Sequence, residues 1–150
     1  MAVLGFCFEK NSIKYCVMEG TKQNPVFVKY DKLIIPNSSD LGGFTNWCET
    51  SINSLIIQFS PSVIGAKLSL DSKKDTIASW YYPLALLHKV SYERSLIAEE
   101  FASRNFTATK FNMDKTINIY NYIDDFFGVQ TPKLDRNYKY ALLSAWMVLE

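Results

Sequence analysis

The hydrophobic period of this chain changes near residue 40, and no other feature limits its fold as strongly. Before the change, three β-rich runs are separated by two short polar turns. Short turns favour antiparallel pairing of consecutive strands. The first third therefore predicts an antiparallel meander with strands over residues 3–8, 13–18 and 25–35.

After the change, segments with apolar residues at helical spacing alternate with strand-like segments. Pro61 ends the first helix, Pro83 is expected in the first turn of the second, and Gly128 is expected to cap the third. The predicted elements are a helix over 44–59, a strand over 62–70, a helix over about 79–104, a strand over 106–111, and helices over 113–127 and 134–149.

The element order is therefore β-β-β-α-β-α-β-α, which predicts an α/β fold with a mixed sheet. Right-handed crossovers place the fourth strand beside the first, so the expected strand order is 3-2-1-4-5, with helices flanking the sheet. The 150 residues are one domain by length, and we expect a single domain over 1–150.

The charge balance excludes a strongly basic nucleic-acid binder, because 16 Lys and Arg stand against 15 Asp and Glu. A basic patch on one face of the molecule is still compatible with this net charge. Three cysteines, no CxxC motif and a single histidine argue against a zinc site or a disulfide framework. We expect reduced thiols, a cytoplasmic location and no membrane-spanning segment, since the longest uncharged run, residues 50–66, contains polar residues and a proline.

Two short motifs stand near the ends of the chain: VLGF at residues 3–6 and NYKYALLSAW at residues 137–146. The first resembles the start of strand one in the Holliday-junction-resolvase branch of the ribonuclease H-like superfamily, where a catalytic aspartate follows. The second resembles the last helix of that branch, whose pattern is Asp-x-x-Asp-Ala-Leu. The predicted element order is also that of the ribonuclease H-like fold. A fainter resemblance is to small uncharacterised bacterial proteins with a lysine in strand four.

The resemblance implies a site for two divalent ions held by carboxylates. The four acidic positions fall on Cys7 in strand one, Lys67 in strand four, and Asn137 and Tyr140 in the last helix. None of these is a carboxylate, and a lysine repels a metal ion. We therefore expect a catalytically inactive domain with no metal cofactor. Its role would be to bind a protein partner, a nucleic acid or a second copy of itself in a homodimer.

Two enzymatic alternatives stay open. The first is a magnesium- or manganese-dependent nuclease with relocated acids, for which Glu9 and Asp71 are the main candidates and Asp135 or Asp75 could contribute. The second uses Cys7 as a nucleophile together with Lys67 in unrelated chemistry. We also expect Cys7 and Lys67 to face one another near the last helix, and Lys67 to find a carboxylate partner, because buried charges need partners.

Several other side chains have a structural and a functional interpretation. The aromatic run Trp80, Tyr81 and Tyr82 could stack on bases, but packing against the sheet is the more frequent role of such residues. His88 is expected to be a core or half-buried imidazole. The basic residues that could contact phosphates, although they more often form a solvated face, are Lys73, Lys74, Lys133, Arg136 and Lys139.

Overall fold

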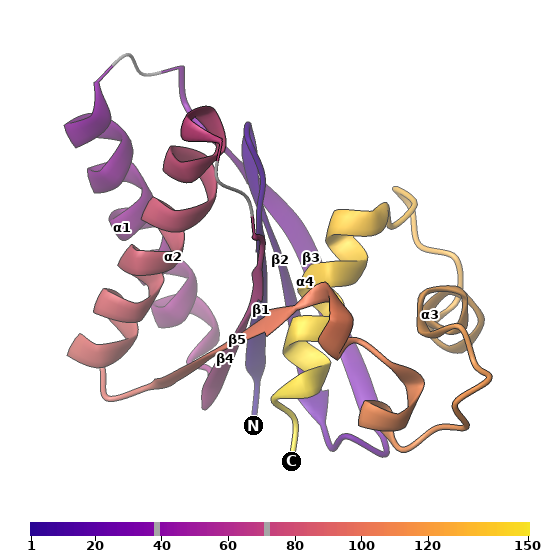
Figure 1. Cartoon of the computed structure of the whole chain (residues 1–150). Coiled ribbons are helices and arrows are strands. Elements are labelled where there is room, and N and C mark those ends of the chain that lie inside the picture. The colour runs from indigo at the N-terminus through magenta and orange to yellow at the C-terminus, as the bar shows by residue number, and fades with distance from the viewer. Residues whose placement is uncertain (38–39, 71–72) are drawn as a thin grey trace.

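The computed structural model describes residues 1–37, 40–70 and 73–150, without the side chains of 74–76. Its centre is a five-stranded sheet in the order β3-β2-β1-β4-β5 (Figure 1). The meander strands pair antiparallel, whereas β4 lies parallel to β1 and β5 parallel to β4. The predicted mixed sheet and its strand order are confirmed. The strands are β1 (Val3–Phe8), β2 (Ser12–Gly20), β3 (Pro25–Ile34), β4 (Val63–Leu68) and β5 (Ile97–Ala102).

Helices cover both faces of the sheet (Figure 1). On one face lie α1 (Leu41–Phe59) and α2 (Lys74–Glu93), and on the other lies α4 (Arg136–Met147), with α3 (Ile119–Phe127) packed outside it. Each face has its own apolar core, because side chains of the central strands alternate between the two. No helix in the described part of the chain is long and apolar enough to span a membrane.

Two glycines set the position of α4. A Cβ atom on Gly5 of β1 would lie 2.0 Å from the carbonyl oxygen of Ala141, and one on Gly65 of β4 would lie 2.1 Å from that of Ser144. The backbone of α4 therefore rests directly on these two parallel strands. This contact holds the first turn of α4 above the carboxyl ends of β1 and β4.

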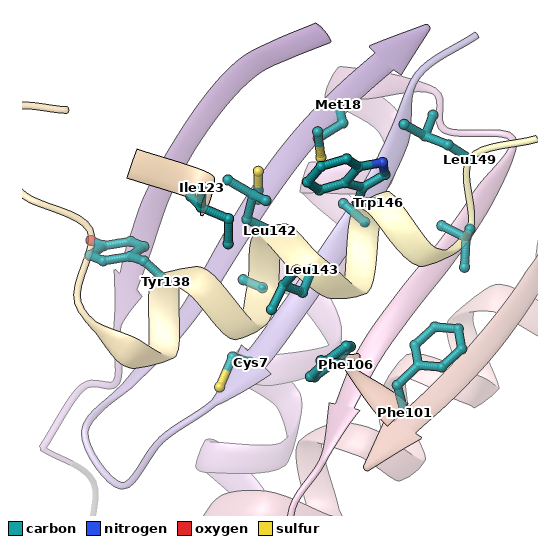
Figure 2. Close-up of a cluster of buried hydrophobic side chains, with 14 of the residues drawn as sticks. Cys7, Met18, Phe101, Phe106, Ile123, Tyr138, Leu142, Leu143, Trp146 and Leu149 are labelled. Carbon is teal, nitrogen blue, oxygen red and sulfur yellow. The ribbon is translucent and has the colours of Figure 1, made fainter. Parts of the chain in front are cut away.

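The core on the α4 face is built around Trp146, which is 1% exposed. Its indole N–H donates to the carbonyl oxygen of Lys22 at 2.9 Å, so the buried polar atom is paired. The ring packs against Phe111 and Phe127, and Figure 2 shows it beside Met18. The rigid core fixes the C-terminal half of α4, and with it the orientation of the helix.

The second half of the chain differs from the sequence prediction at three places. The fifth strand is 97–102, not 106–111, because α2 ends at Glu93 and Ser95 turns the chain with a φ of 56°. Ile97 and Phe101 have helical spacing, but β5 is an edge strand in which Phe101 is buried while Ile97, Glu99 and Glu100 are exposed. Residues 106–111 instead contain a short 3₁₀ helix, Ala108–Phe111.

The other two differences concern helix starts. Helix α2 begins at Lys74, so Pro83 lies inside it and not in its first turn. Helix α3 begins at Ile119 rather than at residue 113, because Asp114 forms a turn in which its carboxylate accepts from the Thr116 N–H at 2.8 Å. The predicted cap at Gly128 is confirmed, with a φ of 77°.

Candidate functional site

Two adjoining clefts open at the carboxyl ends of β1 and β4, the edge at which open α/β sheets bind ligands. The larger has a volume of about 340 Å³ and the smaller about 250 Å³, and they share Ser69 and Trp80. Asn137 from the first turn of α4 lines the larger one. The remaining lining residues are Cys7, Phe8, Glu9, Lys10, Asn11 and Ser12 for the larger cleft, and Lys67, Leu68, Leu70, Ala102 and Ser103 for the smaller.

The structure brings the four predicted pocket residues to this place. Phe6 pairs with Ala66 between β1 and β4, so Cys7 and Lys67 come next on neighbouring strands. Both face α4, since they follow by two residues the glycines that contact this helix. The Lys67 ammonium lies 4.9 Å from the centre of the Tyr140 ring, and Asn137 lines the same cleft as Cys7.

Cys7 is a buried thiol at the floor of the site. It is 2% exposed and lies on its strand beneath α4 (Figure 2). Burial raises the pKa of Cys7 to about 12, and the smaller opposing effect of Lys67 does not compensate. A cysteine acts as a nucleophile through its thiolate. The protonated state therefore argues against the alternative in which Cys7 performs covalent catalysis.

We expect Cys7 to react slowly with thiol reagents in the native protein. With a pKa of about 12, about one Cys7 side chain in ten thousand is ionised at about pH 8. A variant that keeps only this cysteine (Cys16→Ala with Cys48→Ala) should label roughly a hundredfold more slowly folded than in denaturant. Labelling at similar rates in both states would show an open, activated thiol instead.

Lys14 is a site residue that sequence analysis missed. It lies on β2 opposite Cys7, is 6% exposed, and donates to Glu9 Oε1 at 3.1 Å and to the carboxylate of Asp135. Its ammonium also lies 4.6 Å from the centre of the Tyr138 ring. The signal was present, because side chains two apart on a strand share a face, which places Lys14 on the same face as Cys16 in a β-rich run. A lysine at such a position must find carboxylate partners.

The two nearby carboxylates are both engaged with this lysine. Glu9 also accepts from the Ser12 hydroxyl at 2.5 Å and from the Asn137 side-chain amide. Asp135 caps α4, accepting from the Asn137 and Tyr138 N–H groups at 3.0 and 2.9 Å. Although partial burial opposes it, the hydrogen bond from Lys14 lowers the pKa of Asp135. In the same way, the bonds to Asp135 and Glu9 outweigh desolvation and raise the pKa of Lys14.

The donor set does not fit a pair of divalent ions. Magnesium and manganese sites need several carboxylate oxygens aimed at one point. Among the described residues of the site, the two carboxylates, Glu9 and Asp135, already bind an ammonium. In residues 1–37, 40–70 and 73–150, no three His, Cys, Asp or Glu side chains are placed to share a metal. Asp71 and the side chain of Asp75 lie outside the described residues.

Lys67 is the cationic group of the smaller cleft. Its ammonium donates to the carbonyl oxygen of Leu68 and to the Ser69 hydroxyl, both at 3.0 Å. Among residues with described positions, no carboxylate forms an ion pair with it, in contrast to the expected carboxylate partner. These contacts and the Tyr140 ring hold the Lys67 ammonium in the smaller cleft, which Trp80 also lines.

Further basic and aromatic residues surround the clefts. The Arg136 guanidinium stacks 3.3 Å from the centre of the Tyr120 ring, whereas Lys139 is buried and bonded to Asp124 at 2.6 Å. Trp80 packs partly against the α1–α2 core while lining both clefts. His88 is half-buried and lies 2.6 Å from Glu100, away from the site. Arg136 is thus a better candidate for phosphate contact than Lys139.

Solved structures match this chain along nearly its whole length. RuvC of T. thermophilus in complex with a Holliday junction superposes with a TM-score of 0.75 at 9% identity, over 98% of this chain and 91% of that chain. The yeast mitochondrial Holliday junction resolvase Ydc2 superposes with a TM-score of 0.65 at 13% identity, over 97% of this chain and 78% of that chain. The fowlpox virus Holliday junction resolvase superposes with a TM-score of 0.57 at 10% identity, over 99% of this chain and 94% of that chain.

The chain has a ribonuclease H-like fold. This confirms the fold predicted from element order and the likeness to Holliday junction resolvases. No protein-family model matches the sequence, and no curated protein matches it significantly. At such low identity the likeness concerns the fold, and the chemistry of this chain has to be argued from its own side chains.

Proposed function

We propose that this chain is a catalytically inactive ribonuclease H-like domain that binds structured nucleic acid without a metal ion. The observation that carries the proposal is the ammonium of Lys14, which is bound by both Glu9 and Asp135. This ammonium supplies, from within the chain, the positive charge that a divalent ion would otherwise bring to these two carboxylates. The proposal includes a single domain that acts in the reducing cytoplasm, where its three thiols stay free.

The resemblance to resolvases supports the loss of catalysis. When the sequence motifs are matched to those of resolvases, the acidic positions of the family fall on a thiol, an ammonium, an amide and a phenol, those of Cys7, Lys67, Asn137 and Tyr140. These side chains lie together at the clefts, so the substitutions affect one place in the molecule. A thiol and an amide are poor magnesium ligands, and the ammonium adds like charge.

The surroundings of the clefts support a nucleic acid as the ligand. Lys67 and the exposed Lys10 can contact phosphates, and Arg136 stands at the start of α4. Trp80 and Tyr140 offer aromatic surface for an unpaired base. The resolvase neighbours suggest branched DNA, because both the RuvC and the fowlpox virus resolvase were solved with a Holliday junction.

We expect the protein to bind a four-way DNA junction in EDTA and to leave it uncleaved with magnesium or manganese. Fluorescence anisotropy with junction, duplex, single-stranded DNA and RNA–DNA hybrid would measure binding, and gels would measure cleavage. Lys67→Glu should weaken binding roughly tenfold, because it reverses a charge facing the phosphates. Lys110→Glu is the matched control, since Lys110 adjoins Phe111, which packs at the far end of α4.

Two results would contradict the proposal in different ways. Binding to none of these nucleic acids would leave a protein partner as the ligand. Micromolar manganese binding, or cleavage abolished by Glu9→Gln or Asp71→Asn, would establish the relocated-acid nuclease. That alternative has one structural argument in its favour, because Glu9 does line the larger cleft beside Cys7.

A further inference from the structure

Arg136 carries a charge that its position in the fold does not favour. It is the first residue of α4, where the helix dipole is positive and stabilises anions rather than cations. The adjacent Asp135 carboxylate is already bound to Lys14. Lys139 in the same turn is paired with Asp124 at 2.6 Å, whereas Arg136 is exposed and forms no ion pair with any residue that the structure describes. This cation is therefore available to an anion from outside the chain.

Aromatic rings hold the Arg136 guanidinium in place. It lies 3.3 Å from the centre of the Tyr120 ring and 5.4 Å from that of Tyr140, and its Nε donates to the Tyr140 hydroxyl at 3.4 Å. Tyr120 is itself fixed, because its N–H donates to Asn118 Oδ1 at 3.0 Å and its carbonyl oxygen accepts from Lys139 at 2.7 Å. A planar guanidinium that is stacked in this way can bind two oxygens of one phosphate with its remaining N–H groups.

Lys67 is a second cation beside the same aromatic ring. Its ammonium lies 4.9 Å from the centre of the Tyr140 ring, and it has no carboxylate partner among the described residues. Two like charges held near one ring repel each other. An anion that contacts both cations relieves this repulsion, so we expect the place to attract a group with more than one negative charge.

Hydroxyl groups and an aromatic face complete the surroundings of Lys67. The Ser69 oxygen accepts from the Lys67 ammonium at 3.0 Å, so the hydrogen of this hydroxyl can be donated to a ligand. Ser103 is exposed and lines the same cleft. Trp80 lines it as well and offers a face on which a base can stack. The cleft thus combines donors for a phosphate with a surface for the base next to that phosphate.

A phosphate monoester matches these groups better than a phosphodiester inside a strand. A monoester carries a charge of about −1.5 to −2 at neutral pH and has three acceptor oxygens. A phosphodiester carries a single negative charge. The two cations and two hydroxyls around this cleft supply the charge and the donors that a monoester needs. In a nucleic acid, monoesters occur at the 5′ or 3′ ends of strands.

We propose that Arg136 and Lys67 form a binding site for the terminal phosphate of a nucleic-acid strand, with the adjoining base against Trp80. This inference rests on the proposed function and narrows its ligand to nucleic acid with a phosphorylated strand end. Tyr140 and Tyr120 are positioning residues in this site, because their rings fix where the two cations stand.

A comparison of strand ends tests the site. Fluorescence anisotropy would measure the binding of one single-stranded DNA, with an internal fluorophore, in three versions: with a 5′ phosphate, with a 3′ phosphate, and with hydroxyls at both ends. The wild type should bind one phosphorylated version roughly tenfold more tightly than the strand with hydroxyl ends, because the phosphate adds charge-assisted hydrogen bonds.

Variants assign this preference to named side chains. Arg136→Gln and Lys67→Gln should each remove most of it. Tyr120→Leu should weaken it, whereas Tyr120→Phe should keep it, because phenylalanine retains the stacked ring. Arg94→Gln is the matched control and should leave the preference unchanged, since Arg94 follows α2 on the opposite face of the sheet and its Nε donates to Asn53 at 2.6 Å. Circular dichroism would confirm that each variant is folded.

The outcomes separate this inference from the proposed function. Equal affinity of the wild type for the three strands, or binding of the four-way junction but of none of them, overturns the inference alone. A preference that persists in both Arg136→Gln and Lys67→Gln overturns the assignment of the site. Free deoxyadenosine monophosphate serves as a competitor. If it binds as tightly as the phosphorylated strand, the ligand is a nucleotide, and both the inference and the proposed function fail.

Discussion

Gly5→Ala is expected to destabilise the protein by at least about 3 kcal/mol, and Gly65→Ala by a similar amount. The added methyl groups would lie 2.0 Å from the Ala141 carbonyl oxygen and 2.1 Å from that of Ser144. These are backbone atoms of a helix whose other side is held by the buried Trp146, so no flexible side chain can give way. The whole of α4 must move off the sheet. Urea denaturation followed by circular dichroism would measure the loss.

Gly42→Ala provides the matched control for the same chemical change. Its Cβ atom would lie 3.5 Å from the nearest heavy atom, an oxygen of the Asp40 side chain, in the first turn of α1. Alanine is tolerated in a helix, so the variant should stay within about 1 kcal/mol of the wild type. If Gly5→Ala were as stable as Gly42→Ala, α4 would not be fixed by its contact with β1.

Element order alone predicted the strand order of this sheet. Short turns and the change of period fix the meander and the parallel crossover, and these determine the strand order. The misplaced fifth strand did not alter that order, because the strand still follows α2. Edge strand β5 carries Glu99 and Glu100 between apolar residues, a pattern that local periodicity cannot distinguish from a helix.

Sequence analysis located some residues of the candidate site and missed their contacts, and this difference has a physical cause. Motif correspondence located Cys7, Lys67, Asn137 and Tyr140, because these positions depend on register within regular elements. The partners of Glu9 depend on tertiary contacts between residues 128 positions apart in the sequence, as its bond with Asn137 shows. The position of Lys14 inside a β-rich run indicated only that it shares a face with Cys16. Its choice of Asp135 could not be known before α4 was placed.

Lys14→Met is expected to destabilise the protein by about 2 kcal/mol near neutral pH. Methionine keeps the volume of the aliphatic stem but leaves Glu9 and Asp135 beside each other without a counter-charge. The loss is smaller than for a fully buried pair, because the side chains of Glu9 and Asp135 are 22% and 55% exposed and keep part of their hydration. Lys10→Met, an exposed position lining the same cleft, should change stability by less than about 0.5 kcal/mol.

The pH dependence of this difference identifies its cause. The pKa of Asp135 is lowered in the folded protein, so its contribution is present above the ordinary value of 3.8 and is lost as the pH falls through the folded value. The pKa of Lys14 is raised, so its contribution is present below 10.5 and is lost as the pH rises through the folded value. Urea denaturation would measure the free energy of unfolding of the wild type and of Lys14→Met across this pH range. The difference between the two proteins should be largest between these two pH limits and should shrink below the lower limit and above the upper one. A gap that is constant with pH would mean that Lys14 acts through packing of its stem, and that the ammonium does not take the place of a metal ion at Glu9 and Asp135.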